Sequence, residues 1–332
     1  MPLKTDLTTL YKIFVNMNKQ KLLLTILLSW VTIYLAAQDG KLPIIDMHQH
    51  AHNKMWRTET GEPLPRICTP EPCVHAPAKY SKDEDILKYT LEAIKKYNIV
   101  RAVISNTDFE VVKYWTSKAP DVFMPGFSFD HPINVNINLL RTEIKNGNIK
   151  VMGEILTQYS GLSPDDINLE PFFELAEEED IPIQIHTTGT GDPNSTTFSI
   201  KAGNPLNLES VMKRHPKLRI YLENAGWPFV QELAALMYRY PNVYADLSTY
   251  TWIYPRTTFY KHLKELIDIG LGKRLMYGSD QMVWPEAIDL SIEAINSADF
   301  LTQEQKRNIF YNNAARFLKL SKDEIAKDHS KK

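Results

Sequence analysis

The sequence predicts a (β/α)8 barrel of the TIM-barrel type, and three observations support that fold class. First, short apolar runs alternate with segments of helical apolar spacing along the chain after residue 40. Second, eight such strand-and-helix units occupy about 280 residues, a length that suits a (β/α)8 barrel. Third, no Gly-x-Gly-x-x-Gly follows the first apolar run. That absence disfavours a dinucleotide-binding open sheet, which is the alternative architecture.

The barrel is expected to occupy residues 38–320. Its strands are expected at 43–48, 100–106, 122–129, 149–156, 182–187, 218–224, 243–247 and 274–279. Apolar residues recur every three or four positions between these runs and predict helices. The clearest stripes are Ile86, Leu87, Leu91 and Ile94, and Phe229, Leu233, Leu236, Met237 and Tyr240.

Four further segments complete the expected organisation. Long loops are inserted at 51–81 and 188–206, and the second is rich in Gly, Pro, Asn, Ser and Thr. A long loop of this composition predicts an ordered active-site loop or a lid. A closing helix is predicted over 302–320, and residues 321–332 are expected to form a charged, flexible tail.

The composition describes an ordinary globular protein. Hydrophobic residues make up 43% of the 332 residues and charged residues 23%, which is enough apolar material for a large core. The formal net charge is −2 and the sequence has no basic stripe, so nucleic acid is not expected as a partner.

Residues 1–37 are expected to be a secretory signal peptide. Lys19 and Lys21 precede an uncharged, mostly apolar run at 22–37, which ends in small residues before a polar junction. Met17 would give an n-region of ordinary length and is a candidate for the true start. A retained membrane anchor is the alternative, although the run is short for a span of roughly 20 residues. The mature protein is therefore expected in the periplasm or outside the cell, with membrane contact only through an uncleaved segment.

The chain has two cysteines, Cys68 and Cys73. Export permits a disulfide, and the proline-rich spacer between them can form a tight loop. A metal site that includes His75 is the alternative, but it lacks the usual second pair of Cys or His ligands. A disulfide between the two cysteines is expected.

The first predicted strand ends in Asp46-Met47-His48-Gln49-His50. Residues two apart in a strand point to the same face, so His48 and His50 present both imidazoles together. Two neutral imidazoles on one face are half of a transition-metal site. The alternative is a chance pair of polar residues at a strand end.

Polar or ionisable side chains also end most of the other predicted strands. In chain order they are His131, Glu154, His186, Glu223, Asn224, Asp246 and Asp280. The active site of a (β/α)8 barrel lies at the carboxyl ends of its strands, so these side chains are expected to meet at one mouth.

This pattern resembles the amidohydrolase superfamily, in particular its amidohydrolase-related branch, also called amidohydrolase 2. The resemblance covers nearly the whole chain after residue 40. Its motifs are Asp46-Met47-His48-Gln49-His50, Ile185-His186, Gly278-Ser279-Asp280 and Tyr311-Asn312-Asn313-Ala314-Ala315-Arg316-Phe317.

The resemblance implies a metal site and a catalytic carboxylate. The implied ligands of one divalent ion are His48, His50, His186 and Asp280, and zinc is the expected metal. Such an ion lowers the pKa of a water molecule and polarises a substrate carbonyl. Asp280 is the implied catalytic residue that orients or deprotonates the water.

One position departs from the family pattern. Asn224 occupies the place where the sixth strand usually carries a catalytic histidine, and asparagine donates a hydrogen bond but does not shuttle a proton. Proton transfer could fall to Glu223, His131 or Glu154, although Glu223 is expected on the strand face opposite Asn224. Glu154 stands near the carboxylate that bridges two metals in binuclear relatives. One ion is expected here. Glu154, like Asn224, is then a candidate catalytic residue, and substrate binding or a structural role inside the mouth are the alternatives for Glu154.

Aromatic and basic residues near the expected mouth are candidates for substrate binding. They are Trp227, Trp252, Trp284 and Arg256, together with His131. Aromatic faces suit flat or cyclic ligands, while the alternatives are loop packing for the tryptophans and a surface ion pair for the arginine. Two other histidines, His215 and His262, are expected on the surface.

These inferences predict an exported metal-dependent hydrolase. It would use a metal-activated water on an amide, lactone or ester bond of a small, cyclic or aromatic substrate. The close alternative is a metal-dependent non-oxidative decarboxylase, because related proteins of the same branch have that activity. A second alternative is a catalytically impaired, ligand-binding barrel, suggested by Asn224. Whether the protein forms a homo-oligomer is left open.

Overall fold

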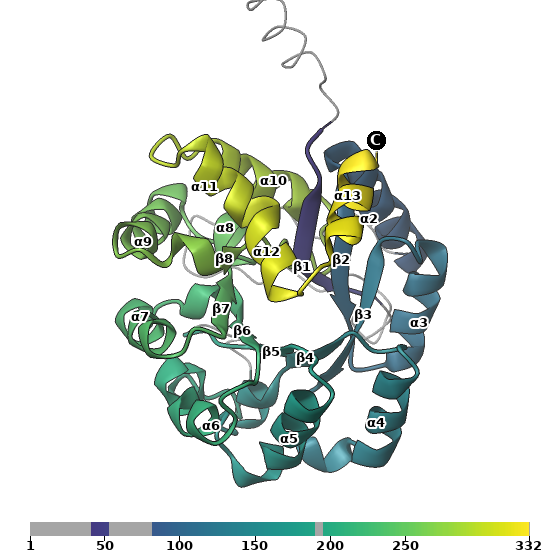
Figure 1. Cartoon of the computed structure of the whole chain (residues 1–332), viewed down its shortest axis with the longest axis vertical. Coiled ribbons are helices and arrows are strands. Elements are labelled where there is room, and N and C mark those ends of the chain that lie inside the picture. The colour runs from purple at the N-terminus through teal and green to yellow at the C-terminus, as the bar shows by residue number, and fades with distance from the viewer. Residues whose placement is uncertain (1–40, 53–81, 190–194, 332) are drawn as a thin grey trace, which may run out of the picture. The chain divides into compact units, whose positions relative to one another are not determined.

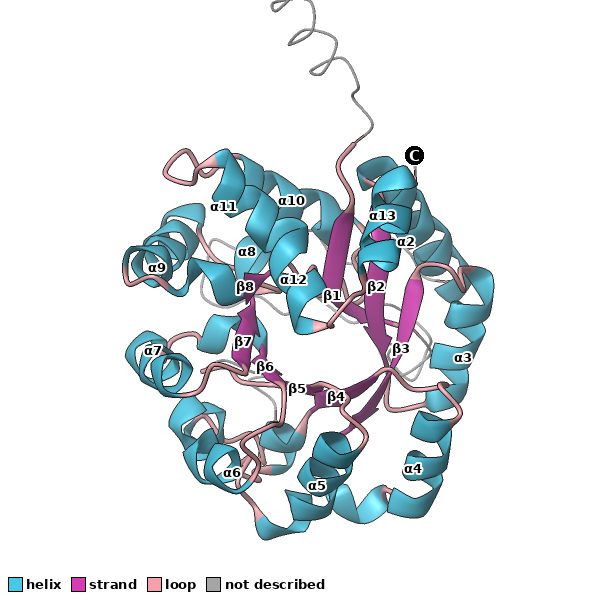
Figure 2. Cartoon of the chain, in the orientation of Figure 1, coloured by secondary structure: helices cyan, strands magenta, loops and turns pink. Residues whose placement is uncertain are grey.

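Eight parallel strands form the centre of the protein, in a computed structural model that describes residues 41–52, 82–189 and 195–331 (Figures 1 and 2). The strands follow one another around a single sheet in the order β1 to β8. They are β1 (Ile44–His50), β2 (Ile99–Ser105), β3 (Phe123–Phe129), β4 (Val151–Ile155), β5 (Ile183–Ile185), β6 (Ile220–Leu222), β7 (Val243–Asp246) and β8 (Leu275–Met276).

The sheet closes between its first and last strands. The backbone N–H of Met47 donates to the carbonyl of Tyr277 at 2.9 Å, and the N–H of Asp280 donates to the carbonyl of His48 at 2.8 Å. The predicted (β/α)8 barrel is confirmed, and every predicted strand overlaps an observed one. We call the carboxyl end of the strands the mouth and their amino end the floor.

Helices surround the barrel and cover the outer face of the strands (Figure 1). They are α2 (Asp83–Tyr97), α3 (Phe109–Lys118), α4 (Ile137–Lys145), α5 (Glu170–Glu178), α6 (Glu209–Arg214), α7 (Val230–Arg239), α8 (Tyr250–Ile253), α9 (Arg256–Asp268), α10 (Glu286–Asn296), α11 (Gln303–Arg307), α12 (Asn313–Phe317) and α13 (Lys322–Ser330). The apolar stripes turn inward as expected: Ile86 and Leu87 of α2 are buried, as are Leu233 and Leu236 of α7. Burial of these stripes is the main source of stability for such helices.

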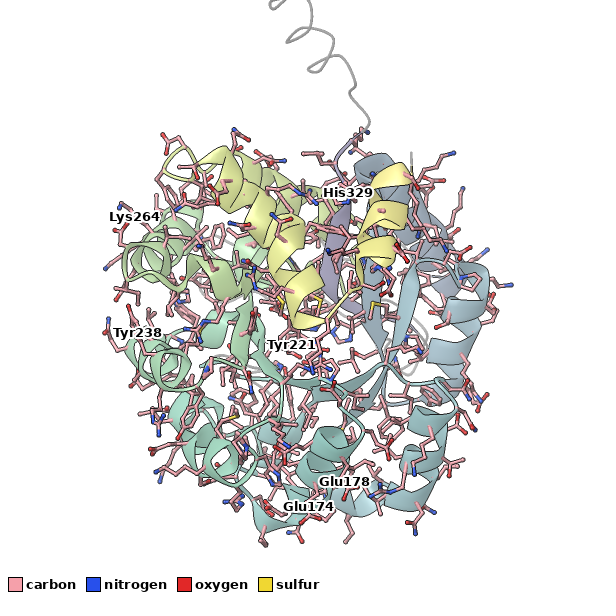
Figure 3. All side chains as sticks on the ribbon, viewed as in Figure 1. Glu174, Glu178, Tyr221, Tyr238, Lys264 and His329 are labelled. Atoms are coloured by element: carbon pink, nitrogen blue, oxygen red, sulfur yellow. The ribbon has the colours of Figure 1, made fainter. Side chains whose placement is uncertain are left out.

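The apolar core has two layers. The larger layer lies between the strands and the helices. The smaller fills the barrel itself and includes Ile45, Met47, Tyr221 and Tyr244. Tyr221 lies near the middle of the ring of strands in Figure 3, and its hydroxyl donates to the carbonyl of Met47 at 2.9 Å. Because side chains alternate along a strand, these inward residues determine which later residues of each strand face the mouth.

The C-terminal segment differs from the expected flexible tail. Residues 322–330 form α13, which begins at a capping box made by Ser321 and Glu324. Asp328 of this helix is fully buried, accepts a hydrogen bond from Tyr311 and pairs with Arg101 of β2 at 2.7 Å. The charged composition of residues 321–332 suggested a solvated tail. The residue that anchors the helix, Asp328, is itself charged and so gave no apolar signal.

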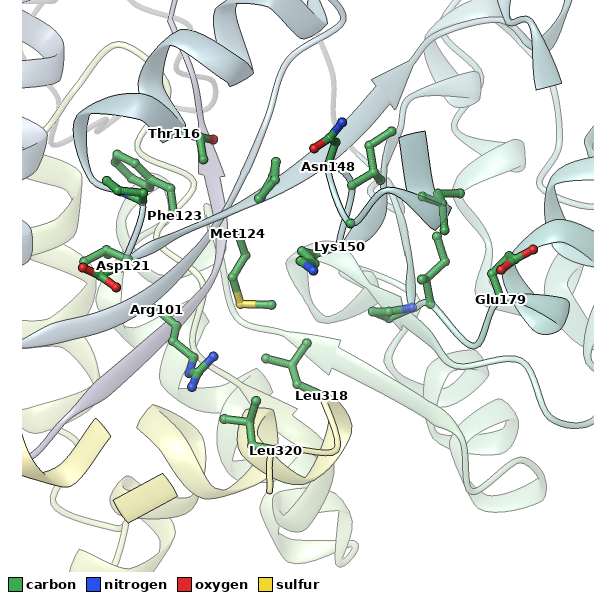
Figure 4. A pocket seen from close by; sticks show the side chains of 18 of the residues that line it. Arg101, Thr116, Asp121, Phe123, Met124, Asn148, Lys150, Glu179, Leu318 and Leu320 are labelled. Atoms are coloured by element: carbon green, nitrogen blue, oxygen red, sulfur yellow. The ribbon is translucent and has the colours of Figure 1, made fainter. Parts of the chain in front are cut away.

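The floor of the barrel is hollowed beside β3 and β4 (Figure 4). This cavity has a volume of about 970 Å³ and is lined mainly by residues that precede strands or end the chain. Labelled among them are Arg101, Asp121, Met124, Lys150, Leu318 and Leu320. The cavity lies at the end of the barrel opposite the polar strand ends.

Several expectations lie outside the described residues. They are the signal peptide at 1–37 and most of the inserted loop at 51–81, including Cys68 and Cys73. The second inserted loop is described except for residues 190–194, and it contains short 3₁₀ turns at Lys201–Gly203 and Pro205–Leu208. Within the described part of the chain, no helix combines the length and the apolar character needed to cross a membrane.

Candidate metal centre

The two histidines at the end of β1 face each other at the mouth. The Nε2 atoms of His48 and His50 lie 3.2 Å apart, and both side chains are about nine-tenths buried or more. The spacing of two residues therefore places both rings on one side, as predicted from strand alternation.

Asp280 completes a three-residue group with these histidines. Its Oδ1 lies 2.9 Å from Nε2 of His50 and 3.6 Å from Nε2 of His48. Its other oxygen accepts a hydrogen bond from the hydroxyl of Thr249. Asp280 has a φ of 46°, a left-handed conformation that aspartate tolerates better than most residues. The chain after β8 thus bends to direct this carboxylate at the histidines.

Glu154 and His186 lie together on the next side of the mouth. Nδ1 of His186 is 2.7 Å from Oε1 of Glu154. The second oxygen of Glu154 points the other way, 3.5 Å from Nε2 of His50 and 3.8 Å from Nε2 of His48. Three of the four expected ligands thus form one group, while His186 stands beside Glu154.

Glu223 also points into the mouth, against expectation. Its Oε2 lies 3.1 Å from Nδ1 of His186 and 4.0 Å from Nδ1 of His48. The expected alternation holds along β6, but Glu223 and not Asn224 lies on the inward face. Tyr221 faces the barrel interior, so Glu223, two residues later, continues on the inward face.

Asn224 leaves the strand instead of continuing it. It has φ 55° and ψ 24°, within a 3₁₀ turn over Glu223–Gly226. Its backbone N–H donates to Asp246 and Ser248, each at 3.2 Å, and its side-chain oxygen accepts from Ser248 at 3.4 Å. The side-chain amide of Asn224 therefore retains its donor hydrogens for another partner.

Asp246 ends β7 beside this turn. Its Oδ1 accepts hydrogen bonds from the backbone of Asn224 and from both the N–H and the hydroxyl of Ser248. Its Oδ2 faces Nδ1 of His48 at 3.6 Å. Asp246 is thus fixed in place with one oxygen directed at the first histidine.

Burial and mutual charge shift the acid–base properties of the group. Burial opposes the charged form of His48, but the negative charges of Asp280 and Glu223 outweigh it and raise the pKa of the ring well above its ordinary value. Burial also opposes ionisation of Glu154, but the hydrogen bond from His186 outweighs it and lowers the pKa of that carboxyl. Burial and the charge of Glu154 raise the pKa of Glu223 well above its ordinary value. The mouth is therefore a strongly coupled set of acids and bases.

The unpaired atoms of this group identify it as a cation site. Six buried atoms of described residues have no hydrogen-bond partner at the mouth: His48 Nδ1, Glu154 Oε2, His186 Nε2, Glu223 Oε1, Asp246 Oδ2 and Asp280 Oδ1. Leaving buried polar atoms unpaired costs free energy, so such atoms call for a partner. Imidazole nitrogens and carboxylate oxygens are the usual ligands of Zn²⁺ and Mn²⁺. These side chains fit a divalent metal ion.

The expected substrate-binding tryptophans pack mainly into the protein. Trp252 is 2% exposed and its indole N–H donates to the carbonyl of Ser279 at 2.7 Å. Trp284 is also buried, with its ring 5.9 Å from that of Trp252. Trp227 is partly exposed and stacks on Tyr250 at 5.4 Å. These contacts match the alternative of loop packing for Trp252 and Trp284, whereas Trp227 keeps an accessible face.

Arg256 and His131 make contacts away from the histidine pair. Arg256 pairs with Glu293 of α10 at 3.8 Å and lies over the ring of Tyr260. Nδ1 of His131 accepts a hydrogen bond from the N–H of Ile133 and caps a short 3₁₀ turn. The ion pair of Arg256 corresponds to the alternative that the sequence left open.

Two histidines expected on the surface are buried. His215 lies between Glu170 and Glu177, at 3.0 Å and 3.4 Å. His262 of α9 packs edge-on against Tyr250, with ring centroids 4.8 Å apart. Neither position stood out in the sequence, because histidine is intermediate in burial and no motif surrounds either residue.

Sequence reasoning also missed an aromatic neighbour of the site. The ring of Tyr159, in the turn after β4, lies 5.1 Å from the ring of His186 and 5.1 Å from that of Phe198. Gln158 holds these two loops together, since its amide donates to the carbonyl of Thr188 at 2.5 Å and to that of Ser199 at 3.1 Å. The loop after β5 thereby contributes an aromatic wall beside His186.

Part of this chain is similar in sequence to a curated protein. A curated relative, the protein fluG of Emericella nidulans, is 24% identical over 155 residues. The match covers 42% of this chain and 18% of fluG, so this chain spans less than a fifth of that relative.

Two solved structures illustrate the similarity of the fold. The first is a probable 2-pyrone-4,6-dicarboxylic acid hydrolase from Acinetobacter baumannii, with 12% identity and a TM-score of 0.60. That match covers 83% of this chain and 99% of the other. The second is a 5-carboxyvanillate decarboxylase from Novosphingobium aromaticivorans with bound manganese, with 16% identity and a TM-score of 0.53. That match covers 73% and 86% of the two chains.

A family model described as amidohydrolase matches residues 45–320. The matched range runs from β1 through the last barrel helices and includes every residue of the candidate metal centre. The sequence resemblance is thereby confirmed. The chain belongs to the amidohydrolase family of metal-dependent enzymes, the amidohydrolase 2 branch, in which hydrolases and decarboxylases share one barrel.

Proposed function

We propose that this protein is an exported hydrolase that uses one catalytic divalent ion, zinc in the first instance, to open an amide, lactone or ester bond in a small cyclic or aromatic compound. The observation that carries the proposal is the buried group of His48, His50 and Asp280 at the mouth of the barrel. Its nitrogen and oxygen atoms converge within 3.6 Å of one another. Manganese is the alternative metal, because carboxylates suit it and a decarboxylase of the same fold binds it.

A divalent ion in this group would supply a water molecule of lowered pKa and would polarise a substrate carbonyl. Asp280 is placed to accept the proton of that water, because its Oδ1 points at the Nε2 atoms of both histidines, where the ion and its water would lie. The hydroxyl of Thr249 holds its other oxygen and keeps the carboxylate oriented. Asp280 is therefore our candidate general base.

Other strand ends have supporting roles in this proposal. The side-chain amide of Asn224 can donate a hydrogen bond to a developing oxyanion, since its oxygen is already used by Ser248. Glu154 orients His186 through the 2.7 Å contact with its Nδ1, which leaves Nε2 of that ring available. Proton delivery to the leaving group falls to Glu223, whose Oε2 lies 3.1 Å from Nδ1 of His186.

The substrate class rests on the aromatic surroundings. Tyr159 and Phe198 form a wall beside His186, and Trp227 keeps a partly exposed ring after β6. Aromatic side chains favour flat ring systems through stacked and edge contacts. A lactone or an amide on a ring would present its carbonyl to the metal while the ring contacts this wall.

Export is part of the proposal and rests on the sequence of residues 1–37. The basic start, apolar run and small residues before a polar junction are those of a secretory signal. Expression of the full chain, followed by N-terminal sequencing of the mature protein, tests this point. A mature chain that begins near residue 38 would support export, and an intact N-terminus in the cytoplasm would contradict it.

A decarboxylase is the second candidate, because a structural neighbour with bound manganese has that activity. Both reactions need the metal, so the assay must separate the products. We would screen metal-loaded protein against lactones, esters, amides and aromatic carboxylic acids, and record acid release and CO₂ release in parallel. Acid release that disappears on chelation supports the hydrolase, and CO₂ release supports the decarboxylase.

The same screen addresses the impaired, ligand-binding barrel suggested by Asn224. Restoring a histidine with Asn224→His is the informative variant. A large gain in activity over an inactive wild-type protein would favour an impaired enzyme and contradict the proposal. Activity of the wild-type protein that falls in Asn224→His would show that the asparagine belongs to the working site.

A further inference from the structure

The inserted loop after β5 is held at two points by one buried side chain. Gln158 lies in the short 3₁₀ turn Thr157–Ser160 after β4 and is 2% exposed. Its Oε1 accepts a hydrogen bond from the N–H of Thr188 at 3.2 Å, and its Nε2 donates to the carbonyl of the same residue at 2.5 Å. Nε2 also donates to the carbonyl of Ser199 at 3.1 Å. One carboxamide therefore fixes two positions of the loop that are eleven residues apart.

The backbone of the same turn strengthens this attachment. The N–H of Ser199 donates to the carbonyl of Gln158 at 3.1 Å, and the hydroxyl of Thr197 donates to the carbonyl of Tyr159 at 2.6 Å. Gly203 packs so closely that a Cβ atom there would lie 2.5 Å from Nε2 of Gln158. The turn after β4 and residues 197–203 therefore form one packed unit.

This unit places two aromatic rings next to the candidate metal centre. The ring of Tyr159 lies 5.1 Å from that of His186, and the ring of Phe198 meets Tyr159 edge-on at 5.1 Å and 65°. Both side chains are partly exposed. Aromatic rings bind other aromatic rings through such edge contacts or through offset stacking. We call Tyr159 and Phe198 the ring pair.

Position 158 requires a particular side-chain chemistry. Thr188 offers an N–H and a carbonyl, and Ser199 offers a second carbonyl, so the side chain between them must supply one acceptor and two donors. A carboxamide does so without carrying a charge. A carboxylate would direct an acceptor at two carbonyls, and an apolar side chain would leave buried backbone groups unpaired, which costs free energy.

We propose that Gln158 is the positioning residue of the ring pair, and that through these two rings it makes the site select a flat aromatic ring over a saturated ring of similar size. Gln158 itself does not touch the substrate in this account. The inference rests on the proposed function, which brings the ring of the substrate beside His186.

The segment that follows His186 is also attached on its other side. The hydroxyl of Thr187 donates to the carbonyl of Glu223 at 3.1 Å, and the N–H of Gly189 donates to the carbonyl of Trp227 at 2.8 Å. Loss of the Gln158 contacts should therefore release the ring pair and leave His186 in place. Ring selection and metal binding should respond differently to a change at position 158.

The competing account is a purely structural role for Gln158. In that case its replacement would lower the stability of the protein and its metal content together, without changing which ring the folded protein prefers. The two accounts differ in the ring preference of the folded, metal-loaded protein.

The test compares benzoate with cyclohexanecarboxylate, which have the same charge and nearly the same size but differ in flatness. Dissociation constants for the zinc-loaded full chain are measured by calorimetry. The wild-type protein should prefer benzoate by about fivefold. Gln158→Met, which keeps the length of the side chain without its hydrogen bonds, should bind both acids equally and retain its zinc. Gln231→Met, at an exposed position of α7, is the matched control and should keep the wild-type preference.

A second variant shows whether Gln158 acts through the ring pair. Tyr159→Leu should abolish the benzoate preference by itself, and adding Gln158→Met to it should cause no further change, because effects that share one partner are not additive. Hydrogen exchange provides a readout without any ligand. The amide of Thr188 should lose protection in Gln158→Met and keep it in Tyr159→Leu.

The outcomes separate this inference from the proposed function. A benzoate preference that survives in Gln158→Met would overturn the inference, as would loss of zinc in that variant. A zinc-loaded wild-type protein that hydrolyses a lactone, ester or amide but shows no benzoate preference would overturn the inference and leave the function intact. No bound zinc or manganese in the wild-type protein would overturn both.

Discussion

The two ends of the barrel treat buried charge in opposite ways. At the floor, Asp328 is fully buried but is paired with Arg101 at 2.7 Å and receives a hydrogen bond from Tyr311. At the mouth, Glu223 and Asp280 are equally enclosed and have only histidines as ionisable partners among the described residues. The floor is built for stability, whereas the mouth stores unfavourable free energy that a ligand can release.

The contrast also shows that the cavity at the floor and the candidate metal centre at the mouth differ in how their charges are paired. The floor contains a hollow of about 970 Å³, yet its charged side chains mostly pair with one another. Asp180, for example, binds Lys319 at 2.6 Å and Arg219 at 3.2 Å. Unpaired buried atoms, and not the size of a hollow, distinguish the functional end of this molecule.

Removing a charge from the mouth should abolish activity without harming the fold. Asp280→Asn should lower the rate of the metal-dependent reaction by about 10³-fold, because a general base is lost. In chelator-treated protein the same change should alter the unfolding free energy by less than about 1 kcal/mol, because the lost contact with His50 is offset by relief of burial and of repulsion from Glu154. Urea unfolding and a steady-state assay measure the two effects. A larger destabilisation of the chelator-treated variant would contradict the account of the mouth.

Removing a charge from the floor should do the reverse. Arg101→Leu leaves Asp328 buried without its cation, which should lower the unfolding free energy by about 3 kcal/mol. Activity of the remaining folded protein should stay near the wild-type value. Adding Asp328→Asn to this variant should restore part of the loss, as urea unfolding would show. A loss well under 1 kcal/mol would mean that α13 contributes little to stability.

Adding a methyl group to a glycine should lower activity at the mouth but not at the floor, because only the mouth lacks space for it. At Gly278 a Cβ atom would lie 2.9 Å from Cβ of His48 and 3.3 Å from Cγ of Asp246. Gly278→Ala should therefore displace metal ligands and lower activity by about 10²-fold. The matched control is Gly272→Ala, where the added atom meets only the mobile end of Ile267. Equal losses in the two variants would refute a specific effect at the mouth.

His262 is a buried histidine of α9 that belongs neither to the mouth nor to the floor, and it should affect the pH dependence of stability. Burial lowers the pKa of its ring to about 3, so the folded protein takes up its proton later than the unfolded chain as the pH falls. Stability should therefore be lost progressively from about pH 6.5 towards pH 3, by roughly 2 kcal/mol at pH 5. His262→Phe should remove this part of the pH dependence in urea unfolding, while His329→Gln, on the surface of α13, should not. An unchanged slope in His262→Phe would disprove the assignment.

The smallest effect is expected far from both ends. Lys264 and Asp268 form an ion pair at 2.6 Å on the exposed face of α9, with both side chains more than half exposed. Solvent screens such pairs, so Lys264→Ala should change the unfolding free energy by less than about 0.5 kcal/mol. Thermal unfolding at low and high salt measures the effect, and a change of several degrees would show that exposed charges matter more than we infer.

The fold could be predicted because it depends on the local periodicity of apolar residues. Alternating apolar runs and helical stripes recur through the chain, and each marks an element whose burial does not depend on a distant partner. The pair at His48 and His50 was predictable for the same reason, because two residues on one strand share a face. The helix at 322–330 was not predictable, since its anchor is the contact of Asp328 with Arg101, 227 positions away.

The sixth strand shows why the site was only partly predictable. Its alternation can be read in either phase from the sequence, because Tyr221 and Leu222 are both apolar enough to face inward. The family resemblance favoured Asn224 as the inward residue, and the structure places Glu223 there instead. Gly226 and Pro228 were the available signal, since they indicate that the strand ends before Asn224.

The contact between Arg101 and Asp328 also constrains how the protein can be made. It joins the second strand to the last helix, so the floor near β2 cannot be completed until almost the whole chain has left the ribosome. Closure of β1 against the segment after β8 has the same requirement. Contacts of such long sequence separation slow folding and leave strand edges exposed in the meantime. A nascent chain of this protein therefore depends on protection from aggregation until α13 has emerged.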